Sequence, residues 1–258
     1  MIPKIIHYCW LSEDPLPEKI KDCIASWREV MPDYEIKLWN TKNFDINSVP
    51  YVKEAYDNRK WAFAADYIRL YAIYQEGGIY LDSDVKVLKR FDEFLQYSFF
   101  SSMEYHPFQI EQDESYKLID PDGNRLCDSY ISGIQIQAAV MGGQKGCKFV
   151  EDILNWYHGR HFMNDNGTLN TNVIAPQIYA RVAEKYGYKY KDMEQTLDGN
   201  IKIFQSEIFA GNRREVTPKS YAIHYCENSW VSSSLWKKLK KYWHFFWFLF
   251  AQKVKKTE

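Results

Sequence analysis

Hydrophobic and polar positions follow two different periods along the chain, and segments of the two kinds take turns. Short runs rich in β-branched and aromatic residues predict strands. Longer segments in which apolar residues recur every three or four positions predict helices. The predicted strands cover 4–9, 34–39, 98–104, 134–141, 201–204 and 221–225, and another ends at the acidic run 82–84. The predicted helices cover 17–30, 50–58, 61–76, 148–157 and 172–186.

Strands that alternate with helices predict an α/β fold whose sheet is mostly parallel and is covered by helices on both faces. In such sheets, ligands bind beyond the carboxyl ends of the strands. The helix predicted at 61–76 stops at Gly77-Gly78, and glycine suits the left-handed conformation in which many helices end. The segment 107–128 is predicted to be a loop that is long for a compact domain, as functional loops often are.

Length and composition predict one globular domain. At 258 residues the chain is long enough for a single large α/β domain with a substantial core. The aromatic fraction of 17% is high and suits stacking on sugars or bases, although most aromatic side chains are expected in the core. The net charge of −1 gives no reason to expect a nucleic acid partner.

The charge is uneven because the C-terminal segment is basic. Residues 231–258 hold seven lysines and one glutamate, and apolar residues recur there at helical spacing. We therefore expect a main domain at 1–234 and a basic amphipathic helix at 235–258. Such a helix suits an anionic membrane surface, and the alternative is docking on the body of the protein or on a second subunit. Its apolar run is far shorter than the ~20 residues that span a bilayer.

Cysteine usage and the N-terminus predict a cytoplasmic protein. The five cysteines are odd in number and include no Cys-x-x-Cys pair, which argues against a disulfide framework or a zinc site. The first residues have neither the charged region nor the apolar run of a signal peptide. Together with the basic tail, this predicts peripheral attachment to the inner face of the cell membrane.

Asp82 and Asp84 are the strongest candidates for chemistry. They follow an apolar run and stand two positions apart, so in a strand both carboxylates point to the same side. Carboxylates placed in this way can converge on one hard cation. The alternative is a pair of solvated aspartates in a turn, and an Asp-x-Asp run alone does not exclude it.

Two other segments are expected at the same edge of the sheet. Asp66 and Arg69 lie on a small-residue face of the helix at 61–76, where alone they would be an exposed ion pair worth a few tenths of a kcal/mol. His224 stands at the end of the last predicted strand, and residues 7–10 end the first. Distant segments are thus predicted to meet in one cleft.

Taken in order, three runs resemble a known family. They are residues 2–10, then Ala65-Asp66-x-x-Arg69, then Gly-Gly-Ile-Tyr-Leu-Asp-Ser-Asp at 77–84. The chain resembles the DXD-containing glycosyltransferases of family 32, a group that includes yeast mannosyltransferases and capsular polysaccharide enzymes. More distantly, it is similar to the glucosyltransferase domains of the large clostridial toxins. The resemblance implies a single GT-A type domain with a Rossmann-like, mixed sheet, a nucleotide-sugar donor and a divalent cation, Mn²⁺ or Mg²⁺.

The resemblance also implies roles for the matched residues. Asp84 would bind the metal directly, and Asp82 would contact the ribose or the metal through water. Asp66 and Arg69 would hold hydroxyl groups of the donor sugar, so these four residues are the catalytic candidates. The implied donor-sugar contacts are Ala65, Asp66, Arg69 and Gly78.

The nucleotide pocket is implied at the first strand and near the C-terminus. Its candidate residues are Ile6, Tyr8, Trp10, Asp82, Ser229 and Trp230. His7 is expected to be structural, since it points to the other side of the strand. His224 resembles the residue that completes the metal shell, and a structural histidine is an equal alternative. Glu227 and Asn228 are competing ligand candidates.

The segment 167–178 departs from the Thr-Gly-Pro-type turn of many relatives. Asn170, Thr171 and Asn172 are predicted to be a helix N-cap cluster, because these residue types accept from the first free N–H groups of a helix. The sequence therefore does not identify the residues that contact the acceptor.

The function implied by the resemblance is retaining transfer of a hexosyl unit from a nucleotide sugar. We expect a UDP-linked donor, such as UDP-galactose, UDP-glucose or UDP-N-acetylhexosamine. The expected acceptor is a glycan, free or linked to a polyprenyl diphosphate lipid, in bacterial capsule or O-antigen synthesis. The alternative is a GDP-mannose-dependent mannosyltransferase, and a non-catalytic sugar-binding module or a metal-dependent hydrolase is less favoured. No carboxylate nucleophile stands out, so a same-face displacement is expected.

Overall fold

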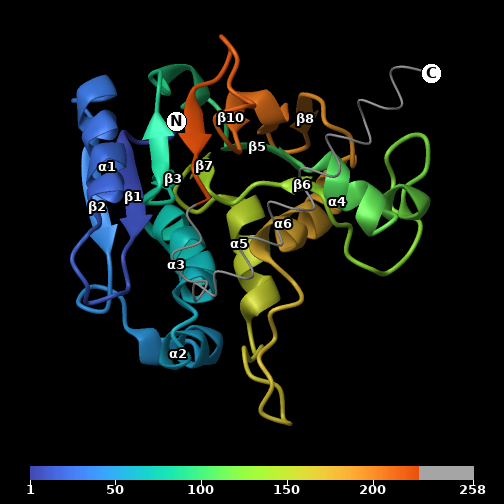
Figure 1. Ribbon diagram of the computed structural model, residues 1–258, viewed down its shortest axis with the longest axis horizontal. Coiled ribbons are helices and arrows are strands. Elements are labelled where there is room, and N and C mark those ends of the chain that lie inside the picture. The colour runs from blue at the N-terminus through green and yellow to red at the C-terminus, as the bar shows by residue number, and fades with distance from the viewer. Residues whose placement is uncertain (227–258) are drawn as a thin grey trace. The chain divides into compact units, whose positions relative to one another are not determined.

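The computed structural model describes residues 1–226, in which two sheets form (Figure 1). The larger sheet has the strand order β2-β1-β3-β7-β5-β9-β8, and β6 pairs with β5. Its strands are β1 (Ile5–Cys9), β2 (Glu35–Trp39), β3 (Gly78–Leu81), β5 (Phe99–Tyr105), β6 (Ile134–Ile136), β7 (Val140–Gly143), β8 (Gln195–Leu197) and β9 (Ile201–Phe204). The smaller sheet consists of β4 (Val85–Val87), β10 (Phe209–Ala210) and β11 (Ala222–His224).

Helices cover both faces of the larger sheet. They are α1 (Glu18–Val30), α2 (Pro50–Asp57), α3 (Trp61–Glu76), α4 (Pro107–Gln112), α5 (Lys148–Tyr157) and α6 (Ala175–Ala183). Short 3₁₀ turns are η1 (Ile46–Ser48), η2 (Asp92–Phe94), η3 (Ser115–Leu118), η4 (Glu184–Tyr186) and η5 (Ser206–Ile208). Figure 1 shows α1 alongside β1 and β2, whereas α3 packs on α5 and α5 on α6. Within the described residues, no helix is both long and apolar enough to cross a bilayer.

Five strands of the larger sheet run in one direction. β1 is parallel to β2 and β3, and β5 is parallel to β9. β7 is antiparallel to both β3 and β5, so β3 and β5 also share a direction. The predicted α/β fold, with a mixed and mostly parallel sheet between helices, is thereby confirmed. The carboxyl ends of β1 and β3 consequently lie at the same edge.

Two apolar cores hold the layers together, and β1 contributes to both. Ile6 and Tyr8 belong to the core that contains Trp27 of α1, whereas Cys9 belongs to the core that contains the buried side of α3. Successive strand side chains point to opposite faces, so one strand supplies two cores. A sheet with two apolar faces requires helices on both, as the sequence pattern predicts.

The end of α3 delivers the chain directly into β3. Gly77 ends the helix with a φ of +71°, and its N–H donates to the carbonyl of Ile73 at 2.7 Å. A Cβ at Gly77 would lie 2.8 Å from Cδ of Pro3 and 2.9 Å from the backbone N of Lys145. Glycine is therefore required here both for the positive φ and for the close approach of the neighbouring segments.

His7 is a structural residue, as its place on the strand predicts. Its Nδ1 accepts from Nε1 of Trp39 at 3.0 Å, so its Nε2 carries the proton and donates to the carbonyl of Gly77 at 2.8 Å. Burial lowers the pKa of His7 below its ordinary value, which agrees with a neutral ring. The imidazole therefore joins β1, β2 and the end of α3.

Some predicted elements differ from those observed. The single strand predicted at 134–141 is two strands, because the chain bends between β6, which pairs with β5, and β7, which pairs with β3 and β5. The long loop predicted at 107–128 contains α4 and η3. The last strand, β11, was expected in the main sheet but lies in the smaller sheet, antiparallel to β4. The strands β4, β8 and β10 are too short to leave a periodic pattern.

Candidate functional site

Asp82 and Asp84 lie in the tight turn that joins β3 to β4. The N–H of Asp82 donates to the carbonyl of Ala139 at 2.8 Å, and the N–H of Val85 donates to the carbonyl of Asp82 at 3.0 Å. These bonds hold the turn at the carboxyl end of β3. Both carboxylates therefore stand at the edge where ligands bind in α/β sheets.

His224 reaches the same turn from the end of β11. β11 pairs antiparallel with β4, which places His224 opposite Val85. The N–H of Tyr225 donates to the carbonyl of Asp84 at 3.2 Å and fixes this register. The imidazole Nε2 lies 3.3 Å from Oδ1 of Asp84 and 3.9 Å from Oδ2 of Asp82.

The three side chains form a cluster that suits a divalent cation. Possible ligand atoms of Asp82, Asp84 and His224 all lie within 4.8 Å of one another, and each side chain is partly buried. Two carboxylates and one imidazole are ligands that Mn²⁺ or Mg²⁺ accepts. Without a metal, burial disfavours the imidazolium, but the hydrogen bonds and charges of Asp84 and Cys226 together outweigh burial and hold the pKa of His224 well above its ordinary value. The cluster therefore attracts positive charge, and these residues fit a metal.

Asp66 and Arg69 form a buried ion pair beside this cluster. Nη2 of Arg69 lies 2.8 Å from Oδ1 of Asp66 and 3.5 Å from Oδ1 of Asp82. The side chains are only 5% exposed for Arg69 and 12% for Asp66, so the pair is not the exposed i,i+3 bridge that spacing alone allows. One guanidinium thus connects the helix pair to the acidic turn.

Burial changes the pKa values of both Asp66 and Arg69. Burial raises the pKa of Asp66 to about 7, although the charge of Arg69 opposes the rise. Burial also disfavours the charged form of Arg69, but Asp82, Tyr80, Asp66 and Tyr179 together more than offset burial and hold the pKa of Arg69 well above its ordinary value. The guanidinium is therefore charged, and it is held in one place by the carbonyls of Ala65 and Ala138 and by Asp66.

Tyr80 and the carbonyl of Ala138 complete the surroundings of the pair. The hydroxyl of Tyr80 donates to Oδ1 of Asp82 at 2.9 Å, and its ring lies 4.8 Å from Cζ of Arg69. Nη1 of Arg69 donates to the carbonyl of Ala138 at 2.7 Å. Neither residue was identified from the sequence. The two-residue spacing from Tyr80 to Asp82 along β3 is the signal that could have found the tyrosine.

The nucleotide-pocket candidates on β1 differ in accessibility. Ile6 is fully buried in the core, which corrects its assignment to the pocket: no part of its side chain can meet a nucleotide. Tyr8 is 8% exposed and packs edge-to-face on Trp27, with ring centroids 5.5 Å apart. Trp10 is partly exposed just beyond β1, where its Nε1 donates to the carbonyl of Asp14 at 2.9 Å. Of the three, Trp10 offers the most surface.

The two small-residue candidates lie in different places. Ala65 stands next to the ion pair, and its carbonyl accepts from Nε of Arg69 at 3.3 Å. Gly78 begins β3, four residues before Asp82, so about 13 Å of strand separates them. A Cβ at Gly78 would meet the carbonyl of Ile5 at 2.8 Å and Nε2 of His7 at 2.9 Å. The assignment of Gly78 to the donor-sugar site is corrected, because its role is packing at the opposite edge.

Two further expectations concern the later part of the chain. The cap cluster predicted at Asn170, Thr171 and Asn172 is wrong, because α6 begins at Ala175, with Ile174 before it. Pro176 in the first turn fixes this start. Ser229, Trp230, the competing ligands at 227–228, the boundary at 234 and the segment 235–258 lie outside the described residues.

The part of the chain that contains α3 and the turn between β3 and β4 is similar to a known family. Residues 17–100 match the model of the family described as "Glycosyltransferase sugar-binding region containing DXD motif". The matched segment includes the pair on α3 and the carboxylates of the β3–β4 turn. The resemblance predicted from the motifs is thereby confirmed for residues 17–100, which are similar to the sugar-binding region of DXD-containing glycosyltransferases.

Two relatives of known sequence are fungal enzymes. The chain is 36% identical over 100 residues to inositol phosphoceramide mannosyltransferase 3 of Schizosaccharomyces pombe. This alignment covers 37% of this chain and 28% of the relative. It is 28% identical over 138 residues to mannosyl phosphorylinositol ceramide synthase SUR1 of Saccharomyces cerevisiae, 46% of this chain and 36% of the relative. The matches thus span about a third of the length of these relatives. Among solved structures, the PaToxG glycosyltransferase aligns with a TM-score of 0.47 at 17% identity, over 71% of this chain and 69% of that one.

Proposed function

We propose that the protein is a metal-dependent glycosyltransferase that transfers a hexosyl unit from a nucleotide sugar to a hydroxyl group of a glycan. The convergence of Asp82, Asp84 and His224 beside a buried Asp–Arg pair carries the proposal. The sugar-binding region at 17–100 supports it, since that region contains all of these residues except His224.

Each side chain has a role in this proposal. Asp84, Asp82 and His224 would hold the divalent cation, which when bound neutralises the charge that a diphosphate leaving group develops. Arg69 and Asp66 would orient the donor sugar, because a fixed guanidinium donates to its hydroxyl oxygens and a carboxylate accepts from its hydroxyl protons. Tyr80 keeps Asp82 in place by donating to its Oδ1.

The base and ribose of the donor would lie against the end of β1. Trp10 follows β1, and the register of β1 with β3 puts this end of β1 at the edge that bears Asp82. The partly exposed indole of Trp10 provides a surface for stacking. Tyr8, Ser229 and Trp230 stay candidates for the same pocket.

The donor is proposed to be UDP-linked, with retention of the anomeric configuration. A same-face displacement fits this site, because the carboxylate of Asp66 is already paired with Nη2 of Arg69 at 2.8 Å and is not free to act as a nucleophile. Transfer of mannose from GDP-mannose is the second candidate. The names of two relatives as mannosyltransferase and mannosyl phosphorylinositol ceramide synthase favour it.

Turnover of a donor panel tests the proposal. Purified protein with Mn²⁺ is incubated separately with UDP-galactose, UDP-glucose, UDP-N-acetylglucosamine and GDP-mannose, and released nucleoside diphosphate is measured. We expect release from one or more UDP-sugars and its loss on chelation with EDTA. Release from GDP-mannose alone would establish the second candidate. No release from any donor, or release unaffected by EDTA, would contradict a metal-dependent transferase.

The proposed acceptor is a lipid-linked glycan of a bacterial surface polysaccharide. The lysine-rich sequence of 235–258, with interspersed tryptophan and phenylalanine, supports attachment to the anionic inner face of the cell membrane. Co-sedimentation with anionic liposomes tests this attachment, with a chain that ends at residue 234 as the comparison. Equal sedimentation of the two chains would exclude the segment as the anchor.

A further inference from the structure

The second ring nitrogen of His224 contacts a cysteine two residues further along the chain. Nδ1 of His224 lies 3.4 Å from Sγ of Cys226, and this sulfur lies 3.5 Å from the carbonyl oxygen of Gly211. Gly211 follows β10, which pairs with β11, so the smaller sheet brings the three groups together. Both distances are in the range of hydrogen bonds to sulfur.

The direction of these hydrogen bonds follows from the carbonyl. Because the carbonyl of Gly211 only accepts, the thiol must donate its single proton to that oxygen. The sulfur then accepts from His224, which places the imidazole proton on Nδ1. Nδ1 then keeps its proton, and Nε2, which lies 3.3 Å from Oδ1 of Asp84, is the nitrogen that would lose its proton to bind a cation.

Cys226 is not itself a ligand candidate of this cluster. Its sulfur contacts Nδ1, whereas the two carboxylates lie on the Nε2 side of the ring. Oxygen and imidazole ligands also suit Mn²⁺ or Mg²⁺ better than sulfur does. The thiol thus acts on the metal site only through the histidine.

The backbone at Cys226 is held in an uncommon conformation. Its φ is +49°, in the left-handed region that non-glycine residues seldom adopt. Such conformations cost on the order of 1–3 kcal/mol and persist where the surroundings maintain them. In this conformation the side chain turns back toward the residue two positions before it, and the thiol reaches Nδ1.

We propose that Cys226 is a positioning residue of the metal site, whose thiol fixes the tautomer and orientation of His224 by accepting from Nδ1 and donating to Gly211. The inference rests on the proposed function, since it assumes that Asp82, Asp84 and His224 hold a cation. Residues that bind the far nitrogen of a metal-ligating histidine commonly change metal affinity by ~10–100-fold. Sulfur is a weak acceptor, so the effect here is expected at the lower end.

Mn²⁺ binding to four variants of the full chain tests the inference, with free Mn²⁺ measured by electron paramagnetic resonance. Cys226→Ala and Cys226→Gly are each expected to weaken Mn²⁺ binding about tenfold. The glycine variant suits a φ of +49° and so separates loss of the thiol from backbone strain. Cys226→Ser is expected to stay within about threefold of the unchanged protein, because a hydroxyl also donates and accepts. Cys127→Ala, at the other thiol that is not buried, is the matched control and should bind normally.

The outcomes separate the inference from the proposed function. If the unchanged chain binds Mn²⁺ and both the alanine and glycine variants bind it equally well, the role of Cys226 is refuted and the metal site stands. The role is also refuted if Cys226→Ser binds as weakly as Cys226→Ala. If the unchanged chain itself does not bind Mn²⁺ in the presence or absence of UDP, the proposed function fails.

Discussion

Replacing Asp84 with asparagine is expected to reduce sugar transfer by about 1000-fold or more, because a bound divalent ion supplies several kcal/mol of charge stabilisation and each 1.36 kcal/mol changes the rate tenfold. The change removes the charge of the carboxylate that lies nearest to His224, at 3.3 Å, and keeps the size of the side chain. The fold should survive, since Asp84 holds the turn through its backbone carbonyl, which accepts from Tyr225. Released nucleoside diphosphate and the melting temperature measure both effects.

Asp198→Asn is the matched control for the Asp84 variant. Asp198 is an exposed aspartate in the turn between β8 and β9, at the amino end of β9 and thus at the opposite edge of the sheet. Its replacement should leave turnover unchanged. Activity within a few-fold of normal in Asp84→Asn would exclude the turn between β3 and β4 as the metal anchor.

Arg69→Ala is expected to lower the free energy of unfolding by about 3–5 kcal/mol, because removing one partner of a buried ion pair leaves the other charge uncompensated. The change deprives Asp66 of its partner at 2.8 Å and the carbonyl of Ala138 of its donor at 2.7 Å. Donor turnover should also be lost, since the guanidinium is proposed to orient the sugar. Urea unfolding measures the stability.

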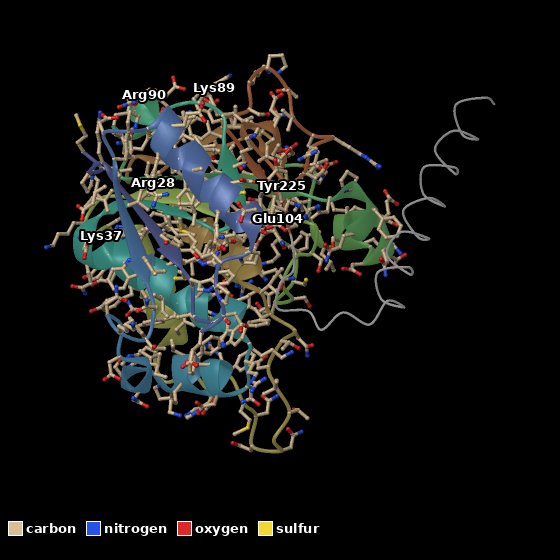
Figure 2. The ribbon with its side chains drawn as sticks, turned by 60° about the vertical axis from the view of Figure 1, so that its left-hand side comes forward. Arg28, Lys37, Lys89, Arg90, Glu104 and Tyr225 are labelled. Atoms are coloured by element: carbon tan, nitrogen blue, oxygen red, sulfur yellow. The ribbon has the colours of Figure 1, made fainter. Side chains whose placement is uncertain are left out.

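Two further variants make the Arg69 result interpretable. Arg28→Ala removes an exposed arginine on α1, labelled in Figure 2, and should change stability by less than about 0.5 kcal/mol. Asp66→Ala combined with Arg69→Ala should lose less stability than the sum of the single changes, because the two side chains interact directly. A loss below about 1 kcal/mol in Arg69→Ala would mean that the pair is not desolvated as its 5% exposure implies.

Local hydrophobic patterns predict much of the fold, and the wrong predictions concern single elements. α5 and β9 lie at the predicted residues because a continuous periodic run marks each of them. The predicted strand at 134–141 is in fact two strands, since the bend between β6 and β7 depends on which distant strands each one pairs with. A two-residue strand such as β10 is defined only by its partner β11 and carries no period of its own.

The sequence predicts the acidic residues and the histidine of the site, but it misplaces or misses several of its neutral residues. Asp82, Asp84 and His224 were expected at one strand end, and their ligand atoms do converge there. Ile6 and Gly78 were misplaced because a motif specifies neither how deeply a side chain is buried nor at which end of a strand it acts. The sequence gives no site role to Cys226, because its contact with His224 depends on a left-handed backbone conformation that cannot be predicted from the residue type.

Binding of UDP with and without Mn²⁺, measured by isothermal titration calorimetry, tests whether the turn between β3 and β4 is a metal-dependent nucleotide-sugar site. The unchanged protein should bind UDP in the presence of Mn²⁺ and lose most of that affinity in EDTA, and Asp84→Asn should bind equally weakly in both conditions. GDP in place of UDP decides between the two proposed donors. If neither nucleotide binds with Mn²⁺ present, or if EDTA does not change the affinity, the turn between β3 and β4 is not a metal-dependent nucleotide-sugar site.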